Sequence, residues 1–267
     1  MSSLVAAAWA LLAFIALNGL LFASAVLRPE STQDLVHVGL IEALVMLGTG
    51  ALVLQVHAPE WSLARALAFR PTTAALVLLC FVIGLCLRLP ADSLRQWVEV
   101  WSPTPEEVLL AQSQLLRYDT AAQMIQLFLV LVVVGPLVEE VFYRGALFGP
   151  LLRSQGVASA VMTTSLAFVF THGQWRDFLA LLPVAVVLGL VRGLTGSLLP
   201  AFALHAAFNL SAVWALSFGA ASATEPVQAP IWVTALCWIL VFGLCALAGR
   251  LALDNPLAVM AREDDLD

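Results

Sequence analysis

The chain contains no lysine. All twelve of its basic residues are arginine, and charged residues make up only 11% of its 267 residues. Soluble domains carry about 25% charged residues, whereas 61% of this chain is apolar and its mean hydropathy is +0.96. This composition excludes a soluble globular protein and predicts an all-α, polytopic transmembrane helical bundle that forms one integral domain. The lipid bilayer is the partner that this apolar composition implies. The arginines are scattered singly and form no basic patch, so nucleic acid is not an expected partner.

Cysteine and nucleophile motifs are also scarce. The chain has four cysteines, all in apolar stretches, and none belongs to a CxxC pair. A disulfide framework and a cysteine-based zinc site are therefore not expected. No GxSxG motif occurs either, which disfavours covalent catalysis by serine or cysteine.

Long apolar runs are what the sequence has in abundance. They predict about eight membrane spans, with seven as the alternative. The apolar runs lie at 4–27, 35–57, 72–89, 121–143, 157–172, 178–194, 197–216 and 229–250. The polar stretch 90–120 interrupts this pattern, and its Trp97 and Trp101 suit a membrane interface. The run from Ser102 and Pro103 to Glu107, with its acidic residues, is typical of a helix start, so we expect one amphipathic interfacial helix here.

The spans suggest three segments within the single domain. Residues 1–120 contain the first transmembrane helices and the interfacial segment, and residues 121–216 form a helical core with the polar motifs described next. Residues 217–267 contain the last transmembrane helix and an acidic C-terminal tail.

A charge cluster lies inside one of the most apolar runs, LFLVLVVVGPLVEEVFYRG. Adjacent carboxylates in a membrane span are costly unless they are paired, hydrated or neutralised, so Glu139 and Glu140 mark a candidate functional site. Glu140 and Arg144 are i,i+4 neighbours on a helix and can form an ion pair. Glu139 is turned about 100° away, which leaves it available as a base. A purely structural ion pair is the alternative interpretation.

Two further membrane spans carry polar residues. His172 ends the run FVFTH, while His205 and Asn209 share one helical face in HAAFN because they are four residues apart. Glu42 is the other deep acidic residue, and we expect it to be a packing or hydration partner. A histidine in a membrane helix is often only an interhelical hydrogen-bonding residue, but this chain has just four histidines.

These side chains allow two related chemistries. Glu139, His172 and His205 can bind zinc and leave one position for water. Equally, Glu139 with His172 can hold and deprotonate a water without a metal, while His205 and Asn209 donate to a developing oxyanion. Both alternatives lead to hydrolysis of an acyl bond by an activated water.

EEVFYRG, FVFTH and HAAFN, in this order, resemble the motifs EExxxR, FxxxH and HxxxN of the CPBP family of intramembrane proteases. That family includes the type II CAAX prenyl endopeptidases and the bacterial Abi proteins. The resemblance covers about residues 120–216 and shows no departure at the motif residues. It implies an intramembrane endopeptidase of the glutamate type that cleaves a membrane protein or peptide near a membrane-embedded or lipidated C-terminal segment.

The resemblance also implies a role for each motif residue. Glu139 is expected to be the general base, aided by His172, while Glu140 and Arg144 support the site. His205 and Asn209 are expected to stabilise the oxyanion. No cofactor is favoured, and zinc held by Glu139, His172 and His205 is the alternative.

Other functions stay open at this point. A proton- or ion-coupled transporter also needs buried charged residues, and a non-catalytic membrane scaffold or immunity protein could keep the same fold. The alanine- and arginine-rich composition without lysine suggests a bacterial protein, which we expect in the inner (plasma) membrane. Family substrates include prenylated CaaX tails and bacterial C-terminal sorting tags, and nothing in the sequence selects between them.

Overall fold

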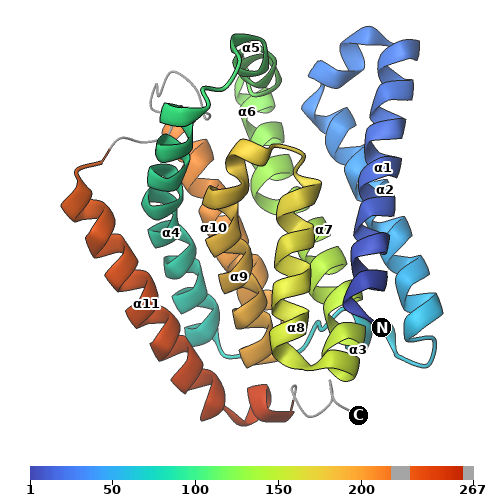
Figure 1. Cartoon of the computed structure of the whole chain (residues 1–267), viewed down its shortest axis with the longest axis vertical. Coiled ribbons are helices and arrows are strands. Elements are labelled where there is room, and N and C mark those ends of the chain that lie inside the picture. The colour runs from blue at the N-terminus through green and yellow to red at the C-terminus, as the bar shows by residue number, and fades with distance from the viewer. Residues whose placement is uncertain (218–228, 261–267) are drawn as a thin grey trace.

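A computed structural model describes residues 1–217 and 229–260, and every regular element in these residues is a helix. Six helices in this part of the chain are long and apolar enough to cross a membrane, and another apolar helix, Leu198–Trp214, is shorter. The protein is therefore an all-α integral membrane protein, as predicted (Figure 1). The predicted division at residues 120 and 216 stays a prediction, and the acidic tail lies outside the described residues.

The helical elements follow one another in this order: α1 (Ser3–Leu27), a 3-10 turn (Pro29–Gln33), α2 (Leu35–His57), the short α3 (Leu63–Ala66), α4 (Ala74–Trp101), α5 (Glu106–Leu115), α6 (Ala121–Phe128), a π-helical segment (Leu129–Val134), α7 (Gly135–Glu140), a second π-helical segment (Val141–Leu147), α8 (Phe148–Thr171), a 3-10 turn (Trp175–Asp177), α9 (Phe178–Thr195), α10 (Leu198–Ser217) and α11 (Ile231–Leu253).

The helical stretch from α6 to α8 corrects the prediction that one span ends at residue 143. Helical structure continues for 51 residues, from Ala121 to Thr171. The chain changes direction within this stretch at Gly156, whose φ of 80° and ψ of 172° are not helical. Glycine adopts such positive φ values without a Cβ clash, so the break occurs there. This stretch contains two of the predicted spans, 121–143 and 157–172, and the apolar helix Leu198–Trp214 is short. The predicted number of about eight spans is therefore approximate.

Helix α4 is longer than predicted because it continues through Pro90 to Trp101 instead of ending at residue 89. A proline inside a helix removes one backbone hydrogen bond. Two side-chain contacts span this turn: Arg88 pairs with Asp92 at 2.7 Å, and the Ser93 hydroxyl donates to the Leu89 carbonyl at 2.6 Å. The polar residues after Pro90 therefore belong to α4.

The predicted interfacial helix is shorter than the polar stretch that contains it. It corresponds to α5, which has Glu106 and Glu107 in its first turn and no buried residue. It lies at one end of the bundle (Figure 1).

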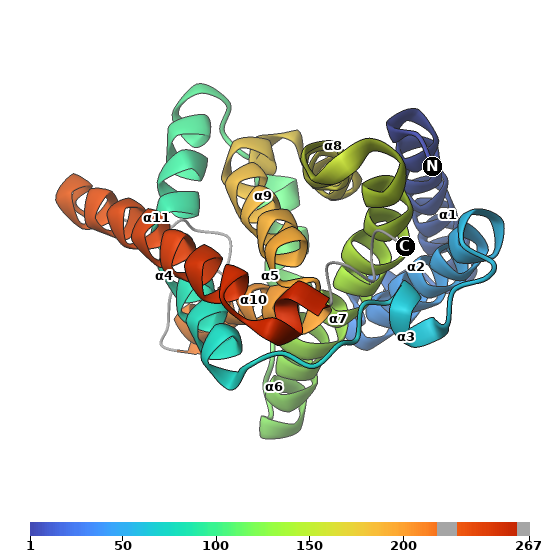
Figure 2. The ribbon, with the colours of Figure 1, turned by 90° about the horizontal axis from the view of Figure 1, so that it is seen from below.

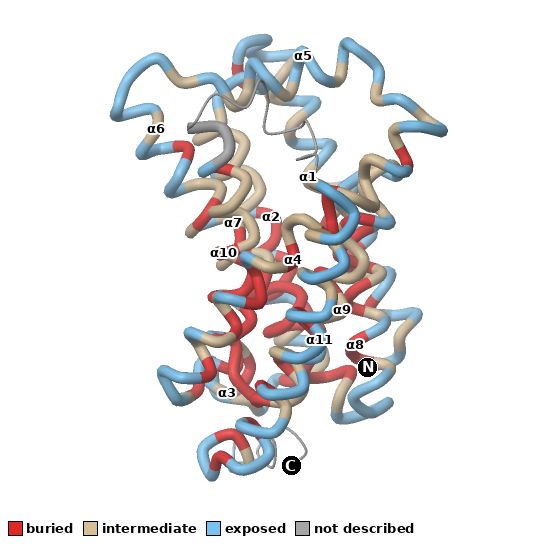
Figure 3. Tube along the Cα trace, turned by 90° about the vertical axis from the view of Figure 1, so that its left-hand side faces the viewer, coloured by how far each residue is buried: buried red, intermediate tan, exposed pale blue. Residues whose placement is uncertain are grey.

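Helix α7, which carries both glutamates of the charge cluster, lies among other helices and not at the edge of the bundle. It packs against α2 and α10, while α4 supports α10 from the other side (Figure 2). α9 packs against both α8 and α10. Buried residues gather in the middle of the bundle and in the half farther from α5 (Figure 3). The core packing thus holds α7, α9 and α10 together.

Helices α4 and α10 approach each other closely at Gly84. A Cβ atom on this residue would lie 2.1 Å from the Leu204 carbonyl oxygen and 2.9 Å from the Ala207 Cβ. Real Cβ atoms do not come this close to a backbone atom, so only glycine allows this spacing. Leu204 directly precedes His205, and Gly84 therefore helps to set the position of that histidine.

We expect Gly84→Ala to destabilise the protein, because the new methyl group forces α4 and α10 apart. Overpacking of this kind costs about 1–3 kcal/mol, or roughly 2–12 °C in Tm for a chain of this size. Thermal unfolding of the purified protein in detergent measures the change. Gly243→Ala in α11 is the matched control, because a Cβ there meets nothing within 4 Å. Equal melting temperatures for the two variants would contradict the close approach.

Candidate active site

The helix that carries Glu139 and Glu140 is distorted on both sides of the glutamates. A π-helical segment precedes α7, and a second one follows it. π-Helical turns are rare and frequently occur at functional sites. Pro136 at the start of α7 has no N–H to donate to the preceding turn, and the Gly135 N–H instead reaches the Val130 carbonyl, five residues back. The backbone is therefore widened directly before the glutamates.

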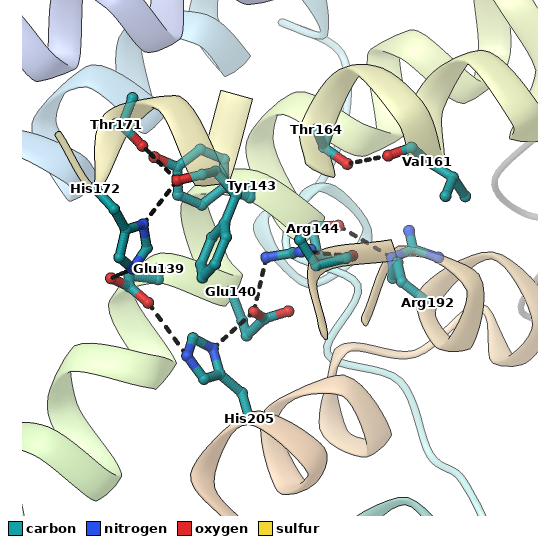
Figure 4. A network of polar contacts seen from close by, with 12 residues as sticks. Glu139, Glu140, Tyr143, Arg144, Val161, Thr164, Thr171, His172, Arg192 and His205 are labelled. Carbon is teal, nitrogen blue, oxygen red and sulfur yellow. Dashed lines mark hydrogen bonds and ion pairs between the residues drawn. The ribbon is translucent and has the colours of Figure 1, made fainter. Parts of the chain in front are cut away.

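Glu140 and Arg144 form the predicted ion pair. The Arg144 Nη1 donates to Glu140 Oε1 at 2.9 Å, and neither side chain is exposed at all (Figure 4). A buried pair of this kind needs further hydrogen bonds to offset the loss of hydration. Arg144 finds one in the Ala185 carbonyl of α9, to which its Nη2 donates at 3.0 Å. The pair thus links α7 to α9.

Aromatic and backbone contacts complete the surroundings of Arg144. Its guanidinium carbon lies 4.8 Å from the centre of the Phe168 ring, a cation–π distance. Its backbone carbonyl accepts a hydrogen bond of 3.1 Å from Nε of Arg192, which is itself 1% exposed. The pair is therefore enclosed by α8 and α9.

His205 lies between the two glutamates. Its Nδ1 is 3.0 Å from Glu140 Oε1, and its Nε2 is 3.4 Å from Glu139 Oε2 (Figure 4). Because Arg144 holds Glu140 as an anion, which only accepts hydrogen bonds, the Nδ1 must carry a proton. This bond orients the imidazole so that Nε2 points at Glu139. One histidine of α10 thus connects the ion-paired glutamate to the other one.

His172 approaches Glu139 from the end of α8. Its Nδ1 lies 2.7 Å from the Phe168 carbonyl, which can only accept a hydrogen bond, so Nδ1 is the donor. The other nitrogen, Nε2, is 3.9 Å from Glu139 Oε1. In a neutral imidazole that nitrogen carries a lone pair. Nε2 faces the Glu139 carboxylate, but the distance between them is longer than a hydrogen bond.

Phe168, the first residue of the FVFTH motif, packs against both histidines. Its ring centre is 4.4 Å from that of His172 and 5.6 Å from that of His205. The centre of the Tyr143 ring lies 5.3 Å from that of Phe168, and the Tyr143 hydroxyl forms a hydrogen bond with the Thr171 hydroxyl. These contacts restrict the orientation of both imidazoles.

Asn209 is held farther along α10. Its amide Nδ2 donates to the Leu131 carbonyl in the first π-helical segment at 2.9 Å. No contact of Asn209 with either glutamate occurs among the described residues. Asn209 therefore links α10 to the π-helical segment that precedes α7, a contact that the sequence did not predict.

Glu42 on α2 was predicted to be a packing or hydration partner, and the structure places it beside Glu139. Its carboxyl group lies within hydrogen-bonding reach of the carboxyl group of Glu139, with His172 and His205 also nearby. The signal in the sequence was an isolated acidic residue in an apolar span, which by default suggests function. Glu139 therefore has ionisable neighbours from α2, α8 and α10.

The zinc alternative needs three ligands around one point. Among residues 1–217 and 229–260, no group of three or more His, Cys, Asp or Glu side chains is arranged to hold a metal ion. Both nitrogens of His205 already face carboxylates. Zinc held by Glu139, His172 and His205 therefore stays a prediction, as does the metal-free alternative.

Comparison with known proteins identifies the family that the segment with Glu139, His172 and His205 resembles. The sequence model of the Rce1-like type II CAAX prenyl endopeptidases matches residues 121–211, about a third of the chain. The match begins with α6 and ends within α10, and it confirms the predicted family resemblance. Searches of curated proteins and of solved structures found no match. Glu42 lies outside the matched residues.

We expect Arg144→Gln to lower the free energy of unfolding by about 3–5 kcal/mol, because it leaves Glu140 buried without its counter-ion. Unfolding of the purified protein in detergent measures this loss. The double variant Glu140→Gln/Arg144→Gln should lose less, since no charge is left unpaired. Arg153→Gln is the control: its pair with Glu60 has a similar length, 3.1 Å, but both side chains are exposed, so about 0–1 kcal/mol is expected. Equal losses for the two arginine variants would contradict a tightly buried pair.

Proposed function

Residues 121–211 belong to the Rce1-like family of type II CAAX prenyl endopeptidases, and from this premise we propose that the protein is an intramembrane endopeptidase of the glutamate type. The observation that carries the proposal is the position of Glu139, between His172 and His205 and next to the buried Glu140–Arg144 pair. This supports a site for an activated water.

The distance between Glu139 and His172 suits a water-bridged pair. The separation of 3.9 Å is too long for a direct hydrogen bond, and a water placed to one side of this line can reach both groups. Glu139 accepts a proton from that water, and the lone pair of His172 Nε2 accepts a hydrogen bond from its other O–H. The water oxygen is then oriented toward the site as a nucleophile.

The proposed reaction needs no covalent intermediate. The water oxygen bonds to the carbonyl carbon of the peptide while one of its protons moves to Glu139. The carbon–nitrogen bond of the resulting tetrahedral intermediate then breaks, and Glu139 returns the proton to the amine that leaves. A carboxylate can serve both as base and as acid in this way within one turnover.

His205 and Asn209 are the proposed donors to the oxyanion. His205 is anchored through Nδ1 on Glu140. In the doubly protonated form that we propose for His205, Nε2 also carries an N–H, on the side of Glu139. The Asn209 amide uses one N–H on the Leu131 carbonyl and has a second N–H for a substrate oxygen. Donors held in place before the reaction stabilise a developing negative charge effectively.

The substrate class follows from the location of the site. A membrane protease of this family acts on a membrane protein or peptide, and we propose cleavage near a membrane-embedded or lipidated C-terminal segment. The composition without lysine supports a bacterial protein of the inner membrane, in which the substrate would carry a C-terminal sorting tag or another apolar tail.

We expect Glu139→Gln to abolish cleavage because the amide cannot accept the proton of water. A loss of about 100- to 10,000-fold is typical when a general base is removed. Cells that produce the wild type, the variant or no protein are compared for the C-termini of their membrane proteins. Shifted C-termini should appear with the wild type alone, at equal expression and Tm.

Glu60→Gln serves as the matched control, since this glutamate is exposed and pairs with Arg153 on the surface. It should generate the same C-termini as the wild type. Processing by Glu139→Gln at the wild-type level would contradict its proposed role. A wild type that processes nothing would contradict the proteolytic function and favour a transporter or a scaffold.

Removal of metal ions should leave activity unchanged, because the proposed water is activated by side chains alone. The purified protein is dialysed against a chelator, its metal content is determined by elemental analysis, and cleavage of a peptide identified above is measured. One zinc ion per chain, together with turnover that is lost on chelation and restored by zinc, would overturn the metal-free mechanism.

A further inference from the structure

Helix α2 packs unusually closely against the helix that carries the glutamates. A Cβ on Gly39 would lie 2.9 Å from Val130 Cγ1 in the first π-helical segment. Glu42 is three residues farther along α2 and therefore lies on the same face of that helix. The close approach at Gly39 directs the carboxyl group of Glu42 toward α7, where it meets Glu139.

The contact between Glu42 and Glu139 requires a proton. Ionised carboxylates only accept hydrogen bonds, so two carboxyl groups can bond each other only when one of them is protonated. Two adjacent carboxylates in an apolar site would also repel each other strongly. The pair therefore holds one proton and one negative charge.

Glu139 is the better position for the charge. Its Oε2 faces Nε2 of His205 at 3.4 Å, and this nitrogen carries a proton in the doubly protonated form of His205 proposed above. Glu42 has no comparable direct partner other than Glu139 among the described residues. The proton thus belongs to Glu42, which donates, and Glu139 accepts.

We propose that Glu42 is a positioning residue of this site: its protonated carboxyl group donates to Glu139 and holds it as the carboxylate that faces the water. This inference rests on the proposed function. During the reaction the proton of Glu42 stays in place, while Glu139 takes one proton from the water and passes it to the leaving amine. Glu42 lies outside the segment matched by the family, so α2 supplies a part of the site that the family motifs do not include.

Infrared spectroscopy tests the protonated carboxyl group without any need for turnover. The difference spectrum between the wild type and Glu42→Gln should contain the C=O stretch of a protonated carboxyl group. The exposed Glu60→Gln gives the control difference spectrum, in which this band is not expected. Absence of the band from the Glu42→Gln difference spectrum would overturn the proposal, whether or not the protein proves to be a protease.

Kinetics tests the positioning role. We expect Glu42→Ala to lower kcat by about 10- to 100-fold, the effect of one lost hydrogen bond to a charged group, with KM nearly unchanged. Glu42→Gln should recover most of this loss because its amide N–H still donates to Glu139. A wild-type kcat in the alanine variant, or a glutamine variant as slow as alanine at equal Tm, would overturn the proposal. Absence of peptidase activity in the wild type would instead contradict the proposed function, and the infrared result would still decide the state of Glu42.

Discussion

The buried ion pair between Glu140 and Arg144 is the interaction on which the arrangement of the site depends. Neither side chain touches solvent, so each must find its partners inside the bundle. Those partners come from three directions: the Ala185 carbonyl from α9, the Phe168 ring from α8 and the imidazole of His205 from α10. Satisfying one pair of charges therefore brings together the helices that form the site.

The same pair explains why the two adjacent glutamates differ. Glu140 is fully enclosed and neutralised, whereas Glu139 remains 14% exposed and faces two histidines and Glu42. His205 links the two environments because one of its nitrogens is held by Glu140 and the other points at Glu139. The ion-paired Glu140 thus orients the histidine that lies beside Glu139. The widened π-helical turns on both sides of α7 give the backbone room for this arrangement.

Local rules predicted the ion pair correctly. The i,i+4 spacing of Glu140 and Arg144 was enough to predict their pairing, since a helix places such residues side by side. The length of the spans was less predictable, because Pro90 and the residues after position 143 did not end their helices. Whether a helix continues past a proline depends on its surroundings, and here the Arg88–Asp92 pair spans the turn that contains Pro90.

The sequence by itself determined the class of protein, the charge cluster and the three polar motifs, since hydropathy and helical spacing are properties of residues close together in the chain. Only the tertiary structure decided that His205 lies between the glutamates, that Asn209 bonds the Leu131 carbonyl, and that Glu42 meets Glu139. These contacts join residues about 65 to 97 positions apart. Their geometry depends on close helix packing, such as that of α2 at Gly39 and of α4 at Gly84, which no local pattern contains.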